Sequence, residues 1–243
     1  MDRIESLIQL LAWGPNGWGD EIAAGTAITV ALGIATLPFG LLLGFLIALA
    51  KHSGGRTARM FGNLYTTVFR GLPELLTLLI IYYGGQRLIQ EVQALLVEDP
   101  EPIEVNAFVA GMVALGMVFS AYSSEVFLGA FKGITIGQIE ASRALGLSRL
   151  LTLRLVVLPQ LWRFALPGIA NLWLILLKET SLVSVIALPD LLRSTFIAVG
   201  VTKEPFFFFL VACLIYLVLA MISSIGIGWI ERWANRGERR AGA

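Results

Sequence analysis

Five charged residues stand inside stretches that are otherwise apolar enough for a membrane: Arg70, Glu74, Glu125, Lys178 and Glu179. A charged side chain that faces lipid costs roughly 2.5–3.5 kcal/mol or more, so each of these should face protein or a water-filled cavity. Ion pairing, gating and contact with a polar solute are the roles open to such charges.

Arg70 and Glu74 are spaced i,i+4, which places them on one face of a continuous helix, where they can pair. Glu125 reaches the same inner leaflet from another apolar stretch and can join them. This intramembrane charge cluster is either a satisfied group that holds spans together or a functional site.

Lys178 and Glu179 lie near the middle of their apolar stretch and are followed by Thr180 and Ser181. Adjacent residues cannot share one helix face, so at least one of the two charges should point into the bundle interior. We therefore expect Lys178, Glu179, Thr180 and Ser181 to belong to a gate or a translocation path.

Catalytic and metal chemistry lack the residues that they need. The chain has one histidine, His52, in a polar segment, and one cysteine, Cys213, inside an apolar run. These two cannot supply a nucleophile with its base, or a set of metal ligands. We expect a protein that is not an enzyme and holds no metal or cofactor, and the net charge of +1 gives no reason to expect a nucleic-acid partner.

The composition requires a membrane around these residues. The chain is 57% hydrophobic and 14% charged, with a mean hydropathy of +0.80, whereas soluble domains carry about 25% charged residues. Since about 20 apolar residues span a bilayer as a helix, we predict an all-α integral membrane protein with five transmembrane helices. The predicted spans are about 24–50, 64–85, 106–131, 164–189 and 205–230, after an interfacial segment at 1–20 and before a basic tail at 232–243.

Lys and Arg residues predict the orientation. The segments 51–63, 132–163 and 231–243 hold 12 of them, and the N-terminus with 86–104 and 190–204 holds 4. Because basic loops stay in the cytoplasm, the N-terminus is predicted outside and the C-terminus inside. The connecting loop 132–163 is then cytoplasmic.

Within that loop, residues 138–160 read as two short helices with a hinge. Residues 139–145 favour a helix, and Gly146 suits the left-handed conformation that often follows a helix end. Ser148 is placed to cap a second helix, which Pro159 is expected to stop. A protruding helix–glycine–helix segment between two spans is suited to binding a cytoplasmic partner protein.

The loop residues Glu140-Ala141-Ser142, Gly146 and Leu158-Pro159 resemble the cytoplasmic signature of binding-protein-dependent ABC importer permeases. The resemblance implies a type I ABC importer transmembrane fold over 24–231 in a bacterial inner membrane. It also implies a coupling role for Glu140, Ala141, Ser142, Gly146 and Pro159, which would transmit the closure of a dimer of ATPase subunits. Ser142 replaces the usual second alanine and keeps a small residue there. A periplasmic substrate-binding protein is a further implied partner.

Other segments resemble the polar amino acid permeases of this family. They are Phe69-Arg70-Gly71-Leu72-Pro73-Glu74-Leu75-Leu76, Ala121-Tyr122-Ser123-Ser124-Glu125 and Lys178-Glu179-Thr180-Ser181-Leu182. Glu-Leu-Leu after Pro73 leans toward the histidine/lysine/arginine/ornithine and octopine/nopaline branch, which implies a polar, basic amino acid or an opine as substrate.

One departure bears on the partner chain. Many relatives have an acid directly after the position of Asn171, where this chain has Leu172-Trp173. The resemblance therefore implies a second, non-identical permease subunit that carries the substrate-binding carboxylate. Pairing with an identical chain and a different mode of substrate recognition is the alternative.

The energy source must lie outside the chain. The sequence contains no Gly-x-x-x-x-Gly-Lys-Ser/Thr phosphate loop, so an ATPase has to be a separate subunit. A channel or a secondary transporter for small polar solutes outside the ABC class is the alternative function. A channel would show polar residues along one helix face, which the first and fifth spans lack, and an inverted-repeat transporter would show internal repeats, which are not visible.

Overall fold

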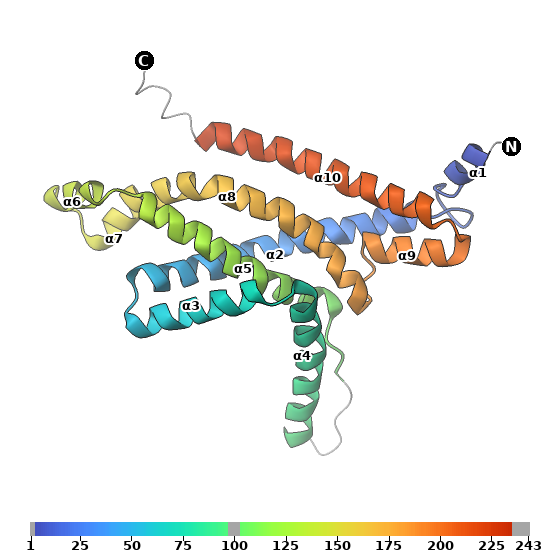
Figure 1. The fold of residues 1–243 in the computed structure, drawn as a ribbon, viewed down its shortest axis with the longest axis horizontal. Coiled ribbons are helices and arrows are strands. Elements are labelled where there is room, and N and C mark those ends of the chain that lie inside the picture. The colour runs from blue at the N-terminus through green and yellow to red at the C-terminus, as the bar shows by residue number, and fades with distance from the viewer. Residues whose placement is uncertain (1–2, 97–102, 235–243) are drawn as a thin grey trace. The chain divides into compact units, whose positions relative to one another are not determined.

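The computed structural model describes residues 3–96 and 103–234, and most of these residues are helical, with no strand among them (Figure 1). The predicted basic tail lies outside the described residues from position 235 on. The helices are α1 (Arg3–Gln9), α2 (Gly19–Ser53), α3 (Arg56–Gly71), α4 (Glu74–Leu96), α5 (Ala107–Gly133), α6 (Ile136–Ala144), α7 (Arg149–Thr152), a π-helical turn (Leu153–Val157), α8 (Leu158–Glu179), a 3₁₀ helix (Thr180–Ile186), α9 (Leu191–Thr202) and α10 (Pro205–Ala234).

The helices have the lengths and compositions of membrane spans. In the described part of the chain, α2, α5, the stretch Arg149–Ile186 and α10 are long and apolar enough to cross a membrane. The sharply bent pair α3 and α4 would count as a fifth span. The predicted all-α membrane protein is confirmed, whereas its orientation stays a prediction.

The predicted span at 64–85 is broken in the structure. α3 ends at Gly71, Leu72 is extended (φ −87°, ψ 143°), and α4 begins at Glu74. Pro73 is the cause, because its ring disfavours a helical conformation at the preceding residue and it has no N–H to donate. The prediction that Arg70 and Glu74 pair on one helix face is therefore wrong, since they lie on different helices.

The prediction that Pro159 stops a helix is also wrong. Pro159 lies in the first turn of α8, which runs on to Glu179. The chain enters α8 through the π-helical turn, where the N–H of Leu158 donates to the carbonyl of Leu153, five residues earlier. A helix loosened in this way leaves room for a proline ring, so Pro159 is accommodated without ending the helix.

The described residues form two compact units, and the first comprises residues 3–36, 73–96, 103–116 and 176–221. Its apolar core contains Ile22, Leu191 and Phe208. The buried Asp190 caps α9, because its Oδ1 accepts from the N–H of Arg193 at 2.9 Å. Burial raises the pKa of Asp190 to about 6, against the lowering effect of the backbone N–H groups.

The second unit comprises residues 37–72, 117–175 and 222–234. Its core joins α2, α5 and α8 around the fully buried Phe127, whose ring meets those of Phe45 and Trp162 edge-on at 5.5 and 5.6 Å between centroids. α2 and α5 approach closely at Gly44, where a Cβ would lie 2.8 Å from the carbonyl oxygen of Ser120. The same core extends to Ile134 and Val157 and receives Ile139 of α6, so the loop is packed onto the span ends.

Candidate functional site

The loop with the family signature folds as a helix, a glycine turn and a second helix. Gly146 follows α6 with φ at +80°, the left-handed conformation that its position predicts. The N–H of Leu147 donates to the backbone carbonyl of Ser142, and the N–H of Gly146 donates to the backbone carbonyl of Arg143. This pair of bonds is the Schellman arrangement at a helix end. Ser148 then caps α7 by accepting from the N–H of Leu151. The turn is therefore defined by hydrogen bonds.

Ser142 has a role that the sequence did not reveal. Its side chain is buried inside this chain, and its hydroxyl lies 3.0 Å from that of Thr152 on α7 while also donating to the carbonyl of Ile139. The small size of residue 142 lets α6 and α7 approach each other. Thr152 was not a predicted site residue, because its partner lies ten residues away across the turn.

The loop has an exposed part, called its outer side here, that consists of Ile136, Glu140, Ala141, Leu145 and Leu150. Three of these residues, Ile136, Leu145 and Leu150, are large and apolar. Exposed apolar side chains grouped on one connection are typical of a protein interface. The three apolar residues were missed because leucine and isoleucine in a membrane protein are usually assigned to spans.

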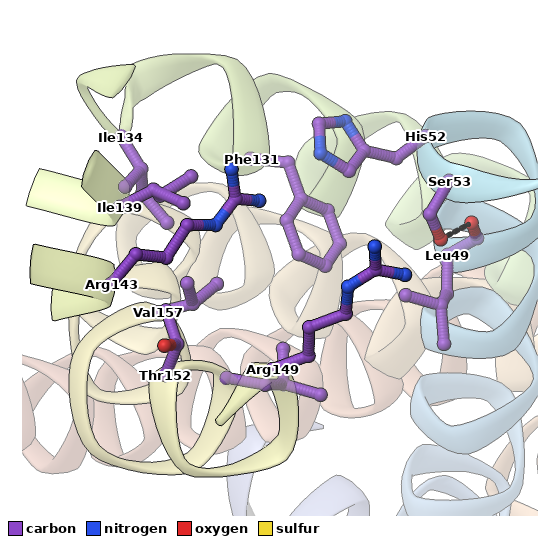
Figure 2. A pocket seen from close by; sticks show the side chains of 11 residues that line it. Leu49, His52, Ser53, Phe131, Ile134, Ile139, Arg143, Arg149, Thr152 and Val157 are labelled. Atoms are coloured by element: carbon purple, nitrogen blue, oxygen red, sulfur yellow. Dashed lines mark hydrogen bonds between the residues drawn. The ribbon is translucent and has the colours of Figure 1, made fainter. Parts of the chain in front are cut away.

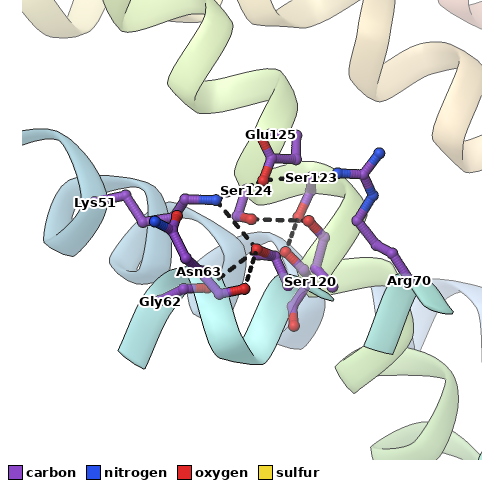
Figure 3. Close-up of polar contacts among 10 residues, drawn as sticks. Lys51, Gly62, Asn63, Arg70, Ser120, Ser123, Ser124 and Glu125 are labelled. Atoms are coloured by element: carbon purple, nitrogen blue, oxygen red, sulfur yellow. Dashed lines mark hydrogen bonds and ion pairs between the residues drawn. The ribbon is translucent and has the colours of Figure 1, made fainter. Parts of the chain in front are cut away.

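A group of charges lies in the second unit, where α2, α3 and α5 meet (Figure 3). Lys51 forms an ion pair with Glu125, and its Nζ lies 3.2 Å from Thr66 Oγ1. Arg70 Nη1 lies 3.7 Å from the same carboxylate oxygen. The side chain of Lys51 is 5% exposed, whereas that of Glu125 is 34% exposed.

This charge group differs from the predicted one. Arg70 and Glu125 are present, Lys51 joins them, and Glu74 belongs to the other compact unit. The sequence predicts Lys51 in a cytoplasmic segment, whereas α2 continues to Ser53 and buries the Lys51 side chain. Arg70 also lies over the ring of Tyr122, 5.5 Å from its centroid. Two cations therefore share one carboxylate, helped by a ring that attracts positive charge.

The predicted gate residues lie where α8 ends. Lys178 is exposed and Glu179 is half-buried, so the two neighbours do point in different directions. The hydroxyls of Thr180 and Ser181 donate to the backbone carbonyls of Leu177 and Lys178, and the chain continues as a 3₁₀ helix. Both hydroxyls are thus engaged by the local helix.

Glu179 lies next to Glu74, which the sequence predicts in a cluster with Arg70 and Glu125. Its carboxyl lies beside that of Glu74 in the first turn of α4, and both residues belong to the first unit. Two carboxyls side by side at membrane depth favour a cationic group beside them. Among the described residues, no group of three or more His, Cys, Asp or Glu side chains could hold a metal ion.

The chain matches a known protein family over most of its length. Residues 40–236 match the model of the binding-protein-dependent transport system inner membrane component. The nopaline transport system permease protein NocQ of Agrobacterium fabrum is 41% identical, covering 96% of this chain and 98% of its own. The histidine/lysine/arginine/ornithine transport system permease protein HisQ of Salmonella typhimurium is 37% identical, covering 93% and 98%.

A solved structure has the same fold. The crystal structure of an amino acid ABC transporter with histidines matches with a TM-score of 0.77 and 30% identity, covering 96% of this chain and 98% of that one. The predicted type I ABC importer fold and the resemblance to polar amino acid and opine permeases are confirmed by these matches.

The charge group predicts a stability effect. Glu125→Gln leaves the buried Lys51 without a counter-charge. Because Glu125 is partly exposed, we expect the free energy of unfolding to fall by about 2 kcal/mol, which is less than the roughly 3–5 kcal/mol lost when a fully buried ion pair is broken. The measurement is the midpoint of thermal unfolding in detergent. Lys51→Met in the Glu125→Gln background should recover part of the loss.

Glu91→Gln is the matched control, since its ion pair with Arg87 is exposed and worth at most about 1 kcal/mol. Equal midpoints for Glu125→Gln and Glu91→Gln, or a double variant less stable than Glu125→Gln alone, would contradict the assignment of Lys51.

Proposed function

The chain belongs to the family of binding-protein-dependent transport system inner membrane components, and we propose that it carries a basic amino acid or an opine across the bacterial inner membrane. As an ABC importer permease it is a multi-pass membrane-transport subunit rather than an enzyme. The substrate proposal rests first on the similarity over nearly the whole length of the chain to NocQ and HisQ, whose names specify nopaline and histidine, lysine, arginine and ornithine.

The carboxyls of Glu74 and Glu179 support a cationic substrate. They stand together in the first unit at a helix end, in a region whose other buried groups are mostly apolar or hydroxyl-bearing. A basic side chain passing these carboxyls would be stabilised by their negative charge. Glu179 thus remains in the proposed translocation path with Lys178, Thr180 and Ser181, and Glu74 joins it.

Energy enters through the cytoplasmic loop in this proposal. The chain lacks a phosphate loop, so ATP is hydrolysed by separate subunits. Glu140 would make the polar contact to an ATPase subunit, and Ile136, Leu145 and Leu150 the apolar one. The orientation with the C-terminus inside, inferred from the basic residues, places this surface in the cytoplasm.

Rigid attachment of the loop would carry the movement into the membrane. Ile139 packs on the core that joins α2, α5 and α8. The hydrogen bond between Ser142 and Thr152 joins α6 to α7, where the stretch Arg149–Ile186 begins. A displacement of α6 by closing ATPase subunits therefore displaces the span ends. Ala141 and Gly146 leave the approach to α6 open, because the first is small and the second has no neighbour near its Cβ position.

The assembly needs a second permease chain. One chain presents one coupling loop, whereas two ATPase subunits close on each other and need two. We take the second chain to be a non-identical homologue, because Leu172-Trp173 stands where many relatives have an acid. A periplasmic substrate-binding protein would deliver the substrate to the opposite side.

Leu145→Ser tests the docking surface. The side chain of Leu145 is 81% exposed, so its loss should leave the fold intact and cost only the partner contact. Loss of one buried leucine at an interface corresponds to about 1.5–3 kcal/mol, and we expect substrate-stimulated ATP hydrolysis by the assembled transporter to fall about tenfold or more. Leu95→Ser is the control, since Leu95 is 85% exposed on α4. Equal rates for the two variants would contradict the proposal.

Glu179→Gln tests the substrate class. In proteoliposomes containing the complete transporter and its binding protein, uptake of arginine should fall about tenfold or more, as expected for loss of a buried charge contact worth roughly 1.5–3 kcal/mol. Glu74→Gln should act in the same direction, and the exposed Glu91→Gln should leave uptake unchanged. Unchanged arginine uptake in both Glu179→Gln and Glu74→Gln would remove these carboxyls from the path.

A further inference from the structure

A pocket of about 270 Å³ lies in the second unit, where the cytoplasmic loop meets the ends of α2 and α5 (Figure 2). Its apolar wall consists of Leu49, Phe131, Ile134, Ile139, Leu153 and Val157. The volume is slightly below the roughly 300–1,000 Å³ of sites that enclose a whole small molecule. The pocket is therefore suited to part of a ligand, such as the head of an amphiphile.

Cationic side chains line the same pocket. Arg143 comes from α6 and Arg149 from α7, and Figure 2 shows both guanidinium groups directed into the space between the loop and α2. Within residues 3–96 and 103–234, neither guanidinium takes part in an ion pair or hydrogen bond. His52 borders the pocket and stacks on Phe131 with 4.7 Å between ring centroids.

The pocket contains no acid that would balance these charges. Its remaining lining residues are Ser53 and Thr152, so the lining carries two permanent positive charges and no negative one. Guanidinium groups bind phosphate through paired hydrogen bonds, and two of them can hold one phosphate from two sides. The lining therefore selects a ligand with an anionic head and an apolar body.

The position of the pocket specifies the source of such a ligand. His52 and Ser53 lie in the last turn of α2, Phe131 lies near the end of α5, and Arg149 begins the stretch that continues into the α8 span. The pocket thus lies at the level where spans leave the membrane, on the side that the basic residues assign to the cytoplasm. Basic pockets between span ends on that side are typical sites for anionic headgroups.

We propose that this pocket binds the phosphate headgroup of an anionic phospholipid, with Arg143 and Arg149 as its ligands and the apolar wall against its glycerol and first methylene groups. The bound lipid would join α6 and α7 to the membrane surface, on the side of the loop that faces the spans. The site goes beyond the proposed transport function, because lipid binding requires neither ATPase nor substrate.

The test counts lipids on the full chain. The purified protein is equilibrated with equal amounts of phosphatidylglycerol and phosphatidylcholine with identical acyl chains, and native mass spectrometry measures which lipid is retained. Wild type should retain phosphatidylglycerol in preference. Arg143→Gln with Arg149→Gln should weaken this preference about 25-fold, since each basic residue near an anionic lipid contributes about fivefold.

Arg56→Gln with Arg59→Gln is the matched control. These arginines are exposed in the first turn of α3, in another segment predicted to be cytoplasmic, and they do not line the pocket. The control variant should retain phosphatidylglycerol as wild type does. An equal loss in both double variants would show a diffuse charge effect and overturn the site.

A second arm separates a lipid from a free anion. Hydrogen exchange of residues 138–152 is followed in phosphatidylcholine nanodiscs, in nanodiscs containing 30% phosphatidylglycerol, and in phosphatidylcholine nanodiscs with millimolar inorganic phosphate. Protection by phosphatidylglycerol alone is the expected result. Equal protection by phosphate would identify a free-anion site, and no protection by either would leave an acidic side chain of the ATPase as the partner; both results overturn the proposal.

Discussion

The rest of the structure depends on the packing of the exposed loop around α6 against the apolar core of the second unit. Ile139 of α6 and Val157 of the π-helical turn belong to the same packed group as Phe127, Phe131 and Leu161. Close-packed interiors transmit displacement because they have little space in which to absorb it. A partner that holds α6 therefore acts on α2, α5 and α8 together, although it touches only the loop.

The loop itself combines two requirements. Its inner side is fixed by specific contacts, namely the Schellman turn at Gly146, the cap by Ser148 and the bond between Ser142 and Thr152. Its outer side presents apolar residues to water, which is unfavourable for the chain alone and favourable once a partner covers them. A chain built to work within an assembly has this division between a fixed inner side and an uncovered outer side.

The intramembrane charges are handled differently in the two units. In the second unit, Lys51 and Arg70 share Glu125, so the negative charge is compensated within the chain. In the first unit, the carboxyls of Glu179 and Glu74 stand side by side, and the neighbouring cation Lys178 is exposed. The first arrangement stabilises a fold, and the second suits a position that a positively charged solute passes.

The sequence predicted the helical membrane class and the conformation of Gly146 because these depend on hydropathy and local backbone preference. The predictions at Pro73 and Pro159 were wrong, and in both places the reason lies in the local backbone. Pro73 breaks a span that hydropathy alone joins, whereas Pro159 is accommodated by a π-helical turn that no short pattern indicates. The pairs Lys51–Glu125 and Glu74–Glu179 could not be predicted, since each joins residues more than 70 positions apart.

We propose that an ATPase subunit holds this chain by the outer side of the loop around α6. The direct measurement is cross-linking in native membranes with a photoreactive probe on a cysteine, introduced as Leu145→Cys or Leu95→Cys in a Cys213→Ser background, with the cross-linked proteins identified by mass spectrometry. We expect a nucleotide-binding subunit to be cross-linked from position 145 and not from position 95. No such subunit at position 145, or equal amounts at both positions, would contradict the proposal.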